Sequence, residues 1–184
     1  ATQLARLDTA AAGAFDATQI GALNATQVRG LTVTQLAALD AADIAEFTTT
    51  QIAGMTTTQL RAFDATQVAA FAETQIAALT TTQLQAFTTT NLSAFTDTQA
   101  AALTTTQISS LLASQVAGLA AADIAEFTNT QLAALTTTQV RSLTQTTLGA
   151  LVDTQIAAFT GTQLQAISST ALVALADSQI GALT

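Results

Sequence analysis

The chain has 184 residues, a formal net charge of −8 at pH 7 and charged side chains at only 9% of its positions. It contains no Cys, His, Lys, Pro, Trp or Tyr, so a Ser or Thr nucleophile would have no His or Lys base. We therefore expect no enzymatic activity, no catalytic residue, no bound cofactor and no metal site. Its four arginines lie scattered between isolated acids, which argues against the clustered positive surface that nucleic acids and anionic membranes require.

Apolar residues recur with a period of eight along the whole chain. Read from Ala1, the sequence divides into 23 octads without remainder, with a consensus close to TTQ(L/I/V)AA(L/F)T. Position seven is apolar in every octad and holds all eight phenylalanines, and position four is Leu, Ile or Val in 21 octads, with Ala12 and Ala100 as exceptions. Fixed-period self-similarity indicates a repeat architecture in which stacked units bury a shared core, here positions four and seven.

The octad period decides between three local structures. In one continuous helix, the apolar stripe would rotate by roughly 80° per octad and could not form one buried seam. In a strand, positions four and seven would point to opposite faces, so a β-solenoid is the alternative rather than the first choice. We predict one short helix in each octad, from 1–8 and 9–16 through to 177–184.

A capping box marks the start of each expected helix. Position eight is Ser, Thr, Asp or Asn in 18 octads, and position three of the next octad is usually Gln, as in Thr80 and Gln83. In such a box the first side chain accepts from a free amide of the opening turn, and the second accepts from the cap residue's own N–H. The apolar residues on either side have the spacing of a hydrophobic staple.

Charged residues and glycines agree with this helix polarity. Ten of the twelve acids occupy positions eight, one or three, where a helix N-terminus favours negative charge, and all four arginines occupy positions five or six. Seven of the eight glycines also lie at five or six, where we expect them to stop the helix. Ala and Gly at position six would permit close backbone approach, and position five should face solvent.

Together these patterns predict an all-α solenoid of 23 short capped helices over residues 1–184, with positions four and seven in a continuous core. Helices this short are marginal in water by themselves, so stacking must stabilise them. The sequence does not fix how many octads complete one turn. Position two is Thr in 18 octads, and threonine ladders between coils are one interpretation of this preference.

A second period of 80 residues relates 41–104 to 121–184. The octad AADIAEFT occurs at 41–48 and again at 121–128, and rare polar residues such as Arg61 and Arg141 recur at the same distance. One interpretation is a tandem duplication without functional meaning. The other interpretation is that these polar residues lie at equivalent angles around the coil axis, where they form lateral contacts. It requires ten octads to be close to a whole number of turns.

Two groups of polar residues are candidates for binding sites. Asp40, Asp43 and Glu46 form the densest acidic group, and Ca²⁺ prefers several oxygen ligands, but capping and first-turn roles explain these acids better. Rows of threonine hydroxyls could form a face that contacts a sugar, ice or a protein, although capping and hydrogen bonds between coils would already use most of them. We therefore assign no ligand site to either group.

Octads such as NTQLAALT at 129–136 and ETQIAALT at 73–80 give the chain a family resemblance. The sequence resembles Thr/Gln-rich octapeptide arrays of very large, predicted secreted or surface proteins of bacteria. This resemblance implies an extracellular or cell-surface structural role with no active-site residues.

Neither end of the chain has the polar cap repeat that a solitary solenoid requires, so we expect the array to continue or to self-associate end to end. The leading functional hypothesis is a segment of an extracellular fibre, stalk or filament. The alternative is a binding module with a Thr-rich face. We expect no segment that spans a membrane. Thr and Gln separate each apolar pair from the next, so no apolar run reaches the length of about 18 residues that a membrane span needs.

Overall fold

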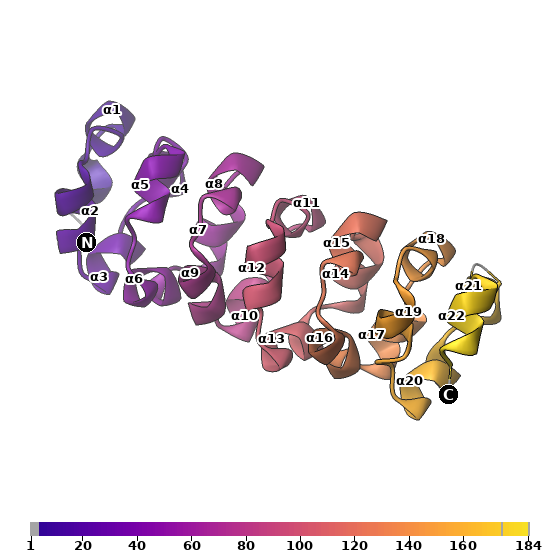
Figure 1. Ribbon diagram of the computed structural model, residues 1–184. Coiled ribbons are helices and arrows are strands. Elements are labelled where there is room, and N and C mark those ends of the chain that lie inside the picture. Colours follow the sequence, from indigo (N-terminus) through magenta and orange to yellow (C-terminus); the bar gives the residue numbers. More distant parts are fainter. Residues whose placement is uncertain (1–3, 174, 184) are drawn as a thin grey trace. The chain divides into compact units, whose positions relative to one another are not determined.

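The computed structural model describes residues 4–173 and 175–183, and in this part of the chain every octad contains one short helix (Figure 1). The helices are η1, a 3-10 helix (Leu4–Arg6), α1 (Thr9–Ala12), α2 (Ala17–Ala22), α3 (Ala25–Arg29), α4 (Val33–Leu36), α5 (Ala41–Ala45), α6 (Thr49–Gly54), α7 (Thr57–Arg61), α8 (Ala65–Ala69), α9 (Glu73–Ala78), α10 (Thr81–Leu84), α11 (Thr89–Leu92), α12 (Asp97–Ala102), α13 (Thr105–Ser110), α14 (Ala113–Gly118), α15 (Ala121–Ala125), α16 (Asn129–Ala134), α17 (Thr137–Arg141), α18 (Gln145–Gly149), α19 (Asp153–Ile156), α20 (Gly161–Ala166), α21 (Ser169–Leu172) and α22 (Asp177–Gly181). The described residues form no strand, so the all-α prediction is confirmed over the β-solenoid.

The chain divides into two compact units, residues 1–102 and 103–184. Each unit is described by itself. The octads continue in phase through the division, since α12 and α13 occupy successive octads. That residues 1–184 form one array stays a prediction.

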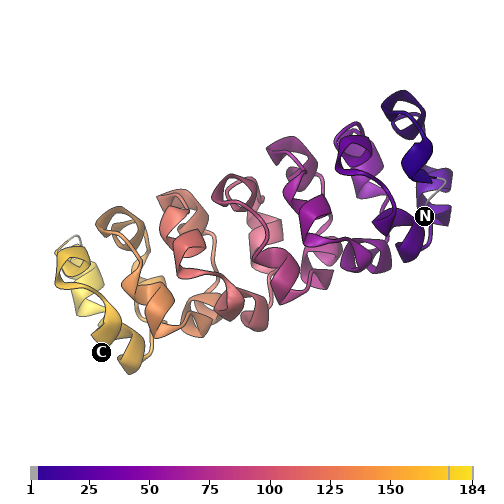
Figure 2. The same ribbon diagram turned by 180° about the vertical axis from the view of Figure 1, so that it is seen from behind.

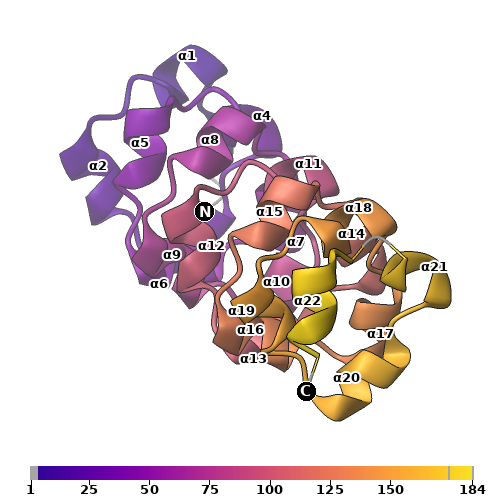
Figure 3. The same cartoon turned by 45° about the vertical axis from the view of Figure 1, so that its right-hand side comes forward.

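Within each unit, helices three octads apart lie against each other. In the first unit α3 packs on α6, α6 on α9 and α9 on α12, and Figure 3 shows α6, α9 and α12 side by side. In the second unit α13 packs on α16, α16 on α19 and α19 on α22. Three octads therefore complete one turn, and the view from behind shows successive helices joined by short corner segments (Figure 2).

Positions four and seven form the core, as the octad pattern predicts. From Ala12 to Ile156 no position-four side chain is more than 5% exposed. The position-seven phenylalanines of consecutive octads meet edge to face, with ring centroids 5.6 Å apart for Phe63 and Phe71. The same arrangement recurs 24 residues later at 6.0 Å for Phe87 and Phe95, which is one full turn along the coil. Edge-to-face pairs are a favoured packing of aromatic rings.

Capping boxes begin the helices at nearly every octad boundary. At α10, Thr80 Oγ1 accepts from Gln83 N–H at 3.2 Å, while Gln83 Oε1 accepts from Thr80 N–H at 2.9 Å. Where position eight has no side-chain acceptor, half of the box persists. Val152, for example, donates its N–H to Gln155 Oε1 at 3.0 Å, but its side chain provides no cap.

Glycines lie at helix ends, as expected, but without the left-handed conformation that often follows a helix. No residue in the described ranges has a positive φ, and Gly13 and Gly30, which end α1 and α3, are right-handed. Each helix ends because the next cap residue turns the chain into extended backbone. The expected close approach at position six is confirmed at Gly54, where an added Cβ would lie 2.7 Å from Ala25 Cβ, on the helix one turn earlier.

Threonine at position two does not form ladders between the coils. Every described position-two residue is exposed, and the side-chain hydrogen bonds given for its threonines, as for Thr98 with Thr96, go to the cap residue two positions earlier and not to another coil. Position five is also mostly exposed, as expected.

The three-octad turn bears on the 80-residue period. Ten octads make three and one third turns, so the interpretation of equivalent angles does not fit this coil. The duplication itself, relating 41–104 to 121–184, stays a sequence-based prediction.

The missing cap at Val152 allows a test of the capping account. Val152→Thr should stabilise the second unit by about 1 kcal/mol, because the new hydroxyl can accept from Gln155 N–H. Val152 is 59% exposed, so no buried apolar contact is lost. Urea unfolding followed by circular dichroism measures the change.

The matched control is Val173→Thr, which changes a 75% exposed valine that lies at the end of α21 and not at a helix start. We expect its stability to stay within about 0.5 kcal/mol of the parent. Equal effects of the two substitutions would contradict the capping account.

Candidate functional site

Buried glutamines at position three join each helix to the preceding coil. Their Oε1 atoms complete the capping boxes, and their Nε2 atoms donate to backbone carbonyls 28, 30 or 31 residues earlier. Such bonds form from Gln35, Gln51, Gln59, Gln67, Gln75, Gln83 and Gln99 in the first unit and from Gln131, Gln139, Gln155, Gln163 and Gln179 in the second. The sequence indicated only the capping role.

Gln83 shows the geometry most completely. Its Nε2 donates to the carbonyl oxygens of Ile52, Ala53 and Met55 at 3.0, 3.1 and 2.8 Å. These carbonyls belong to the C-terminal end of α6, where the last carbonyls of a helix lack partners within the helix. Gln83 is 4% exposed, and its amide therefore satisfies one helix at its start and another at its end.

Shorter side chains at position three make fewer of these bonds. Asn91 Nδ2 reaches only the Phe63 carbonyl, at 2.9 Å. Thr147 Oγ1 donates instead to Thr144 O at 3.0 Å, the carbonyl of its own helix's cap residue. The length of the glutamine side chain is thus what spans the gap between coils.

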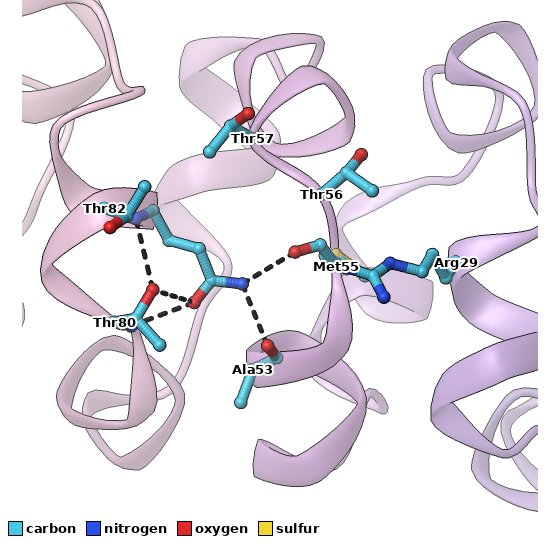
Figure 4. Close-up of a pocket in the computed structure, with 8 residues that line it drawn as sticks. Arg29, Ala53, Met55, Thr56, Thr57, Thr80 and Thr82 are labelled. Atoms are coloured by element: carbon cyan, nitrogen blue, oxygen red, sulfur yellow. Dashed lines mark hydrogen bonds between the residues drawn. The ribbon is translucent and has the colours of Figure 1, made fainter.

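A pocket of about 300 Å³ opens beside Gln83 in the first unit. It is lined by residues of three successive coils: Arg29, Ala53, Met55, Thr56, Thr57, Thr80, Thr82 and Gln83. Figure 4 shows the Arg29 side chain extending toward Met55, with Thr56 above Met55 and Thr57 farther along the chain. None of these residues was singled out from the sequence as part of a site, since 24-residue spacing acquires meaning only once the turn is known.

Most polar groups of the pocket already have partners. Thr56 and Thr80 each donate to a glutamine Oε1 at 3.1 Å, and Gln83 Nε2 is saturated by carbonyls. Over the described ranges, by contrast, Arg29 forms no ion pair, and the hydroxyls of Thr57 and Thr82 form no hydrogen bond. No acidic side chain lines the pocket. It therefore offers a cation and two hydroxyls to a ligand.

The acidic group of residues 40–46 acts in helix capping. Asp40 Oδ1 accepts from Asp43 N–H at 2.9 Å, and Asp43 Oδ2 accepts from Asp40 N–H at 3.0 Å. Glu46 ends α5 and is exposed. Across residues 4–173 and 175–183, no three metal-ligating side chains gather at one place.

The octads match a known repeat. The family model of the ALTTAQ repeat matches residues 36–73, 44–81 and 76–113. Residues 36–113 carry ALTTAQ repeats. Each match begins at position four of an octad, so the ALTTAQ unit and the octad share one register, as the resemblance to Thr/Gln-rich octapeptide arrays predicts. No curated protein matches the chain significantly.

The octad array, with ALTTAQ repeats at residues 36–113, is therefore a helical repeat domain. Among the helices that the structure describes, none has both the length and the apolar character needed to cross a membrane.

The substitution Gln83→Glu tests the amide that joins the coils. It keeps the Oε1 acceptor of the capping box but replaces the donor with an anionic oxygen that faces three carbonyls. We expect a loss of roughly 3 kcal/mol in the free energy of unfolding, because a buried charge and buried carbonyls are left without partners. Urea unfolding measures it.

Gln27→Glu is the matched control. Gln27 Oε1 accepts from Asn24 N–H at 2.8 Å, but its Nε2 has no acceptor within the described ranges. A carboxylate suits this capping box and the helix N-terminus, so stability should stay unchanged or rise by a few tenths of a kcal/mol. A comparable loss in both variants would disprove the role assigned to the Nε2 donor.

Proposed function

We propose that the ALTTAQ array is a structural scaffold, a segment of an extracellular fibre, stalk or filament in which further octads stack on its terminal coils. The exposure of stacking residues at these coils carries the proposal. The extracellular setting is supported by the resemblance to secreted and surface arrays alone.

The first coil exposes residues that the interior buries. Leu7 is 36% exposed and Phe15 and Leu23 are half-buried, whereas position-seven side chains from Leu31 to Leu175 are at most 8% exposed. Within the described ranges, the amide nitrogen of Gln27 also has none of the carbonyl acceptors that its interior counterparts have. The face of this coil thus presents apolar surface together with a free hydrogen-bond donor.

The last coil exposes the complementary set. Ile180 is 52% exposed, and Leu164 and Leu172 are half-buried, although position four is otherwise almost fully covered. This face presents apolar surface, so a coil with the apolar residues of the first coil fits it.

End-to-end stacking predicts association that depends on Ile180. The parent chain should form longer species as its concentration rises, and Ile180→Glu should weaken this association at least about tenfold, because the charge would be desolvated in the contact. Sedimentation velocity over a concentration series measures the effect.

Val173→Glu adds the same charge to the last coil at a residue that is 75% exposed and lies at position five, outside the stacking face. It should associate like the parent. A parent chain that stays monomeric at all concentrations would refute self-stacking.

One observation favours a second function, a binding module with a Thr-rich face. Thr26, Thr50, Thr74 and Thr98 occupy position two in every third octad of the first unit, and all four are exposed. Thr is a weaker helix former than Ala, and these side chains cap no helix, so helix stability does not explain them. A column of exposed hydroxyls and methyl groups could contact ice or a polysaccharide.

Replacing these four threonines with Ala tests the second function. If the column binds, the variant should lose inhibition of ice recrystallisation or binding to cellulose while the helical circular dichroism signal is kept. The control replaces Thr18, Thr66 and Thr90 of the adjacent column, which Ala42 already interrupts. A parent chain with neither activity would eliminate both probes as ligands.

A further inference from the structure

We propose that the pocket of Arg29, Met55, Thr57 and Thr82 binds a small hydroxylated carboxylate of the sugar-acid class, such as a uronic acid residue. The proposal is independent of end-to-end stacking. It rests on three properties of the pocket: an arginine without an acid, two uncommitted hydroxyls and an apolar base.

The cation selects for an anionic ligand. Arg29 is exposed at the end of α3, has no ion pair in the described part of the chain, and shares the pocket with no acidic side chain. A guanidinium presents a planar fork of donors that matches a carboxylate with two parallel hydrogen bonds. A carboxylate placed at the mouth of the pocket would therefore meet the guanidinium without a competing side chain.

The hydroxyls select for a polyol. Thr57 and Thr82 lie on α7 and α10, one turn apart, and neither hydroxyl is committed to a protein partner within the described residues. Thr56 and Thr80 differ, because both are held by their capping boxes. Two free hydroxyls from adjacent coils can each donate to and accept from ring hydroxyls of a sugar.

The apolar lining at the bottom of the pocket and the volume of the pocket favour an organic ligand over an inorganic anion. Ala53 and the 3% exposed Met55 contribute the apolar part of the lining. A volume of about 300 Å³ lies at the lower end of small-molecule sites, so it suits one sugar unit and would leave phosphate largely uncontacted. The net charge of −8 also disfavours a dianion more than a monoanion.

The other position-five residues provide controls. Arg61 Nε already donates to the Ala86 carbonyl at 3.1 Å. Arg141 is exposed at the same octad position in the second unit and is not among the residues that line this pocket. Gln85 and Gln165 occupy position five elsewhere, so Arg29→Gln is a substitution that the octad accepts.

The experiment is an NMR titration of the isotope-labelled chain with D-glucuronate. Amide shifts should change around residues 29, 53–57 and 80–83, with a dissociation constant on the order of 1 mM. Arg29→Gln should weaken binding at least tenfold and Thr82→Val about threefold, whereas Arg141→Gln should leave it unchanged. D-glucose, acetate and phosphate, each tested separately, should bind at least tenfold more weakly than glucuronate.

Several outcomes would overturn the proposal: no shift changes at these residues, equal weakening by Arg29→Gln and Arg141→Gln, or equal binding of glucose or phosphate. A uronate oligomer distinguishes the source of the ligand. Tighter binding of the oligomer than of the monomer would support the proposal with a polysaccharide as the source, and equal binding would support it with a free sugar acid.

Discussion

The buried glutamine amide at position three connects each short helix to the coil before it. Its oxygen accepts the N–H of the cap residue, and its nitrogen donates to the carbonyls at the end of an earlier helix, as in Gln83. Helices of four to six residues would otherwise leave most of their backbone groups without partners. One side chain thus serves two helix ends, and among the described residues no buried side-chain nitrogen or oxygen lacks a hydrogen-bond partner.

Local features of the fold followed from the sequence, and features that depend on the turn did not. The core at Ile52 or Phe63 and the cap at Thr80 could be predicted, because helix starts and apolar spacing depend on residues that are close together in the sequence. The three-octad turn could not, since positions four and seven show no alternation between octads. The hydrogen bonds from Gln83 Nε2 to the earlier coil could not be predicted either. Their acceptors are backbone carbonyls, which every residue has, so residue type does not reveal them.

The same limit explains the candidate site. Arg29, Met55 and Thr82 are 26 and 27 residues apart, and nothing in the octad pattern links them before the coils are stacked. The glycines, by contrast, were placed correctly at helix ends by their position in the octad. Gly30 keeps an ordinary φ of −82°, because the extended cap residue Thr32 of the next helix redirects the chain.

Core and surface are assigned to different positions of the octad. Positions three, four and seven are committed to stacking, whereas two and five are exposed nearly throughout and tolerate Thr, Ala, Arg, Gln or Val. Surface chemistry can therefore change without disturbing the contacts that hold the coils together.

The three-octad turn also gives single-octad insertions a defined geometric effect. Gaining or losing eight residues keeps every donor and acceptor in register, yet it rotates all later octads by one third of a turn about the coil axis. Slippage during gene replication could therefore move a patch of exposed side chains by one third of a turn around the coil, while the buried positions keep their contacts.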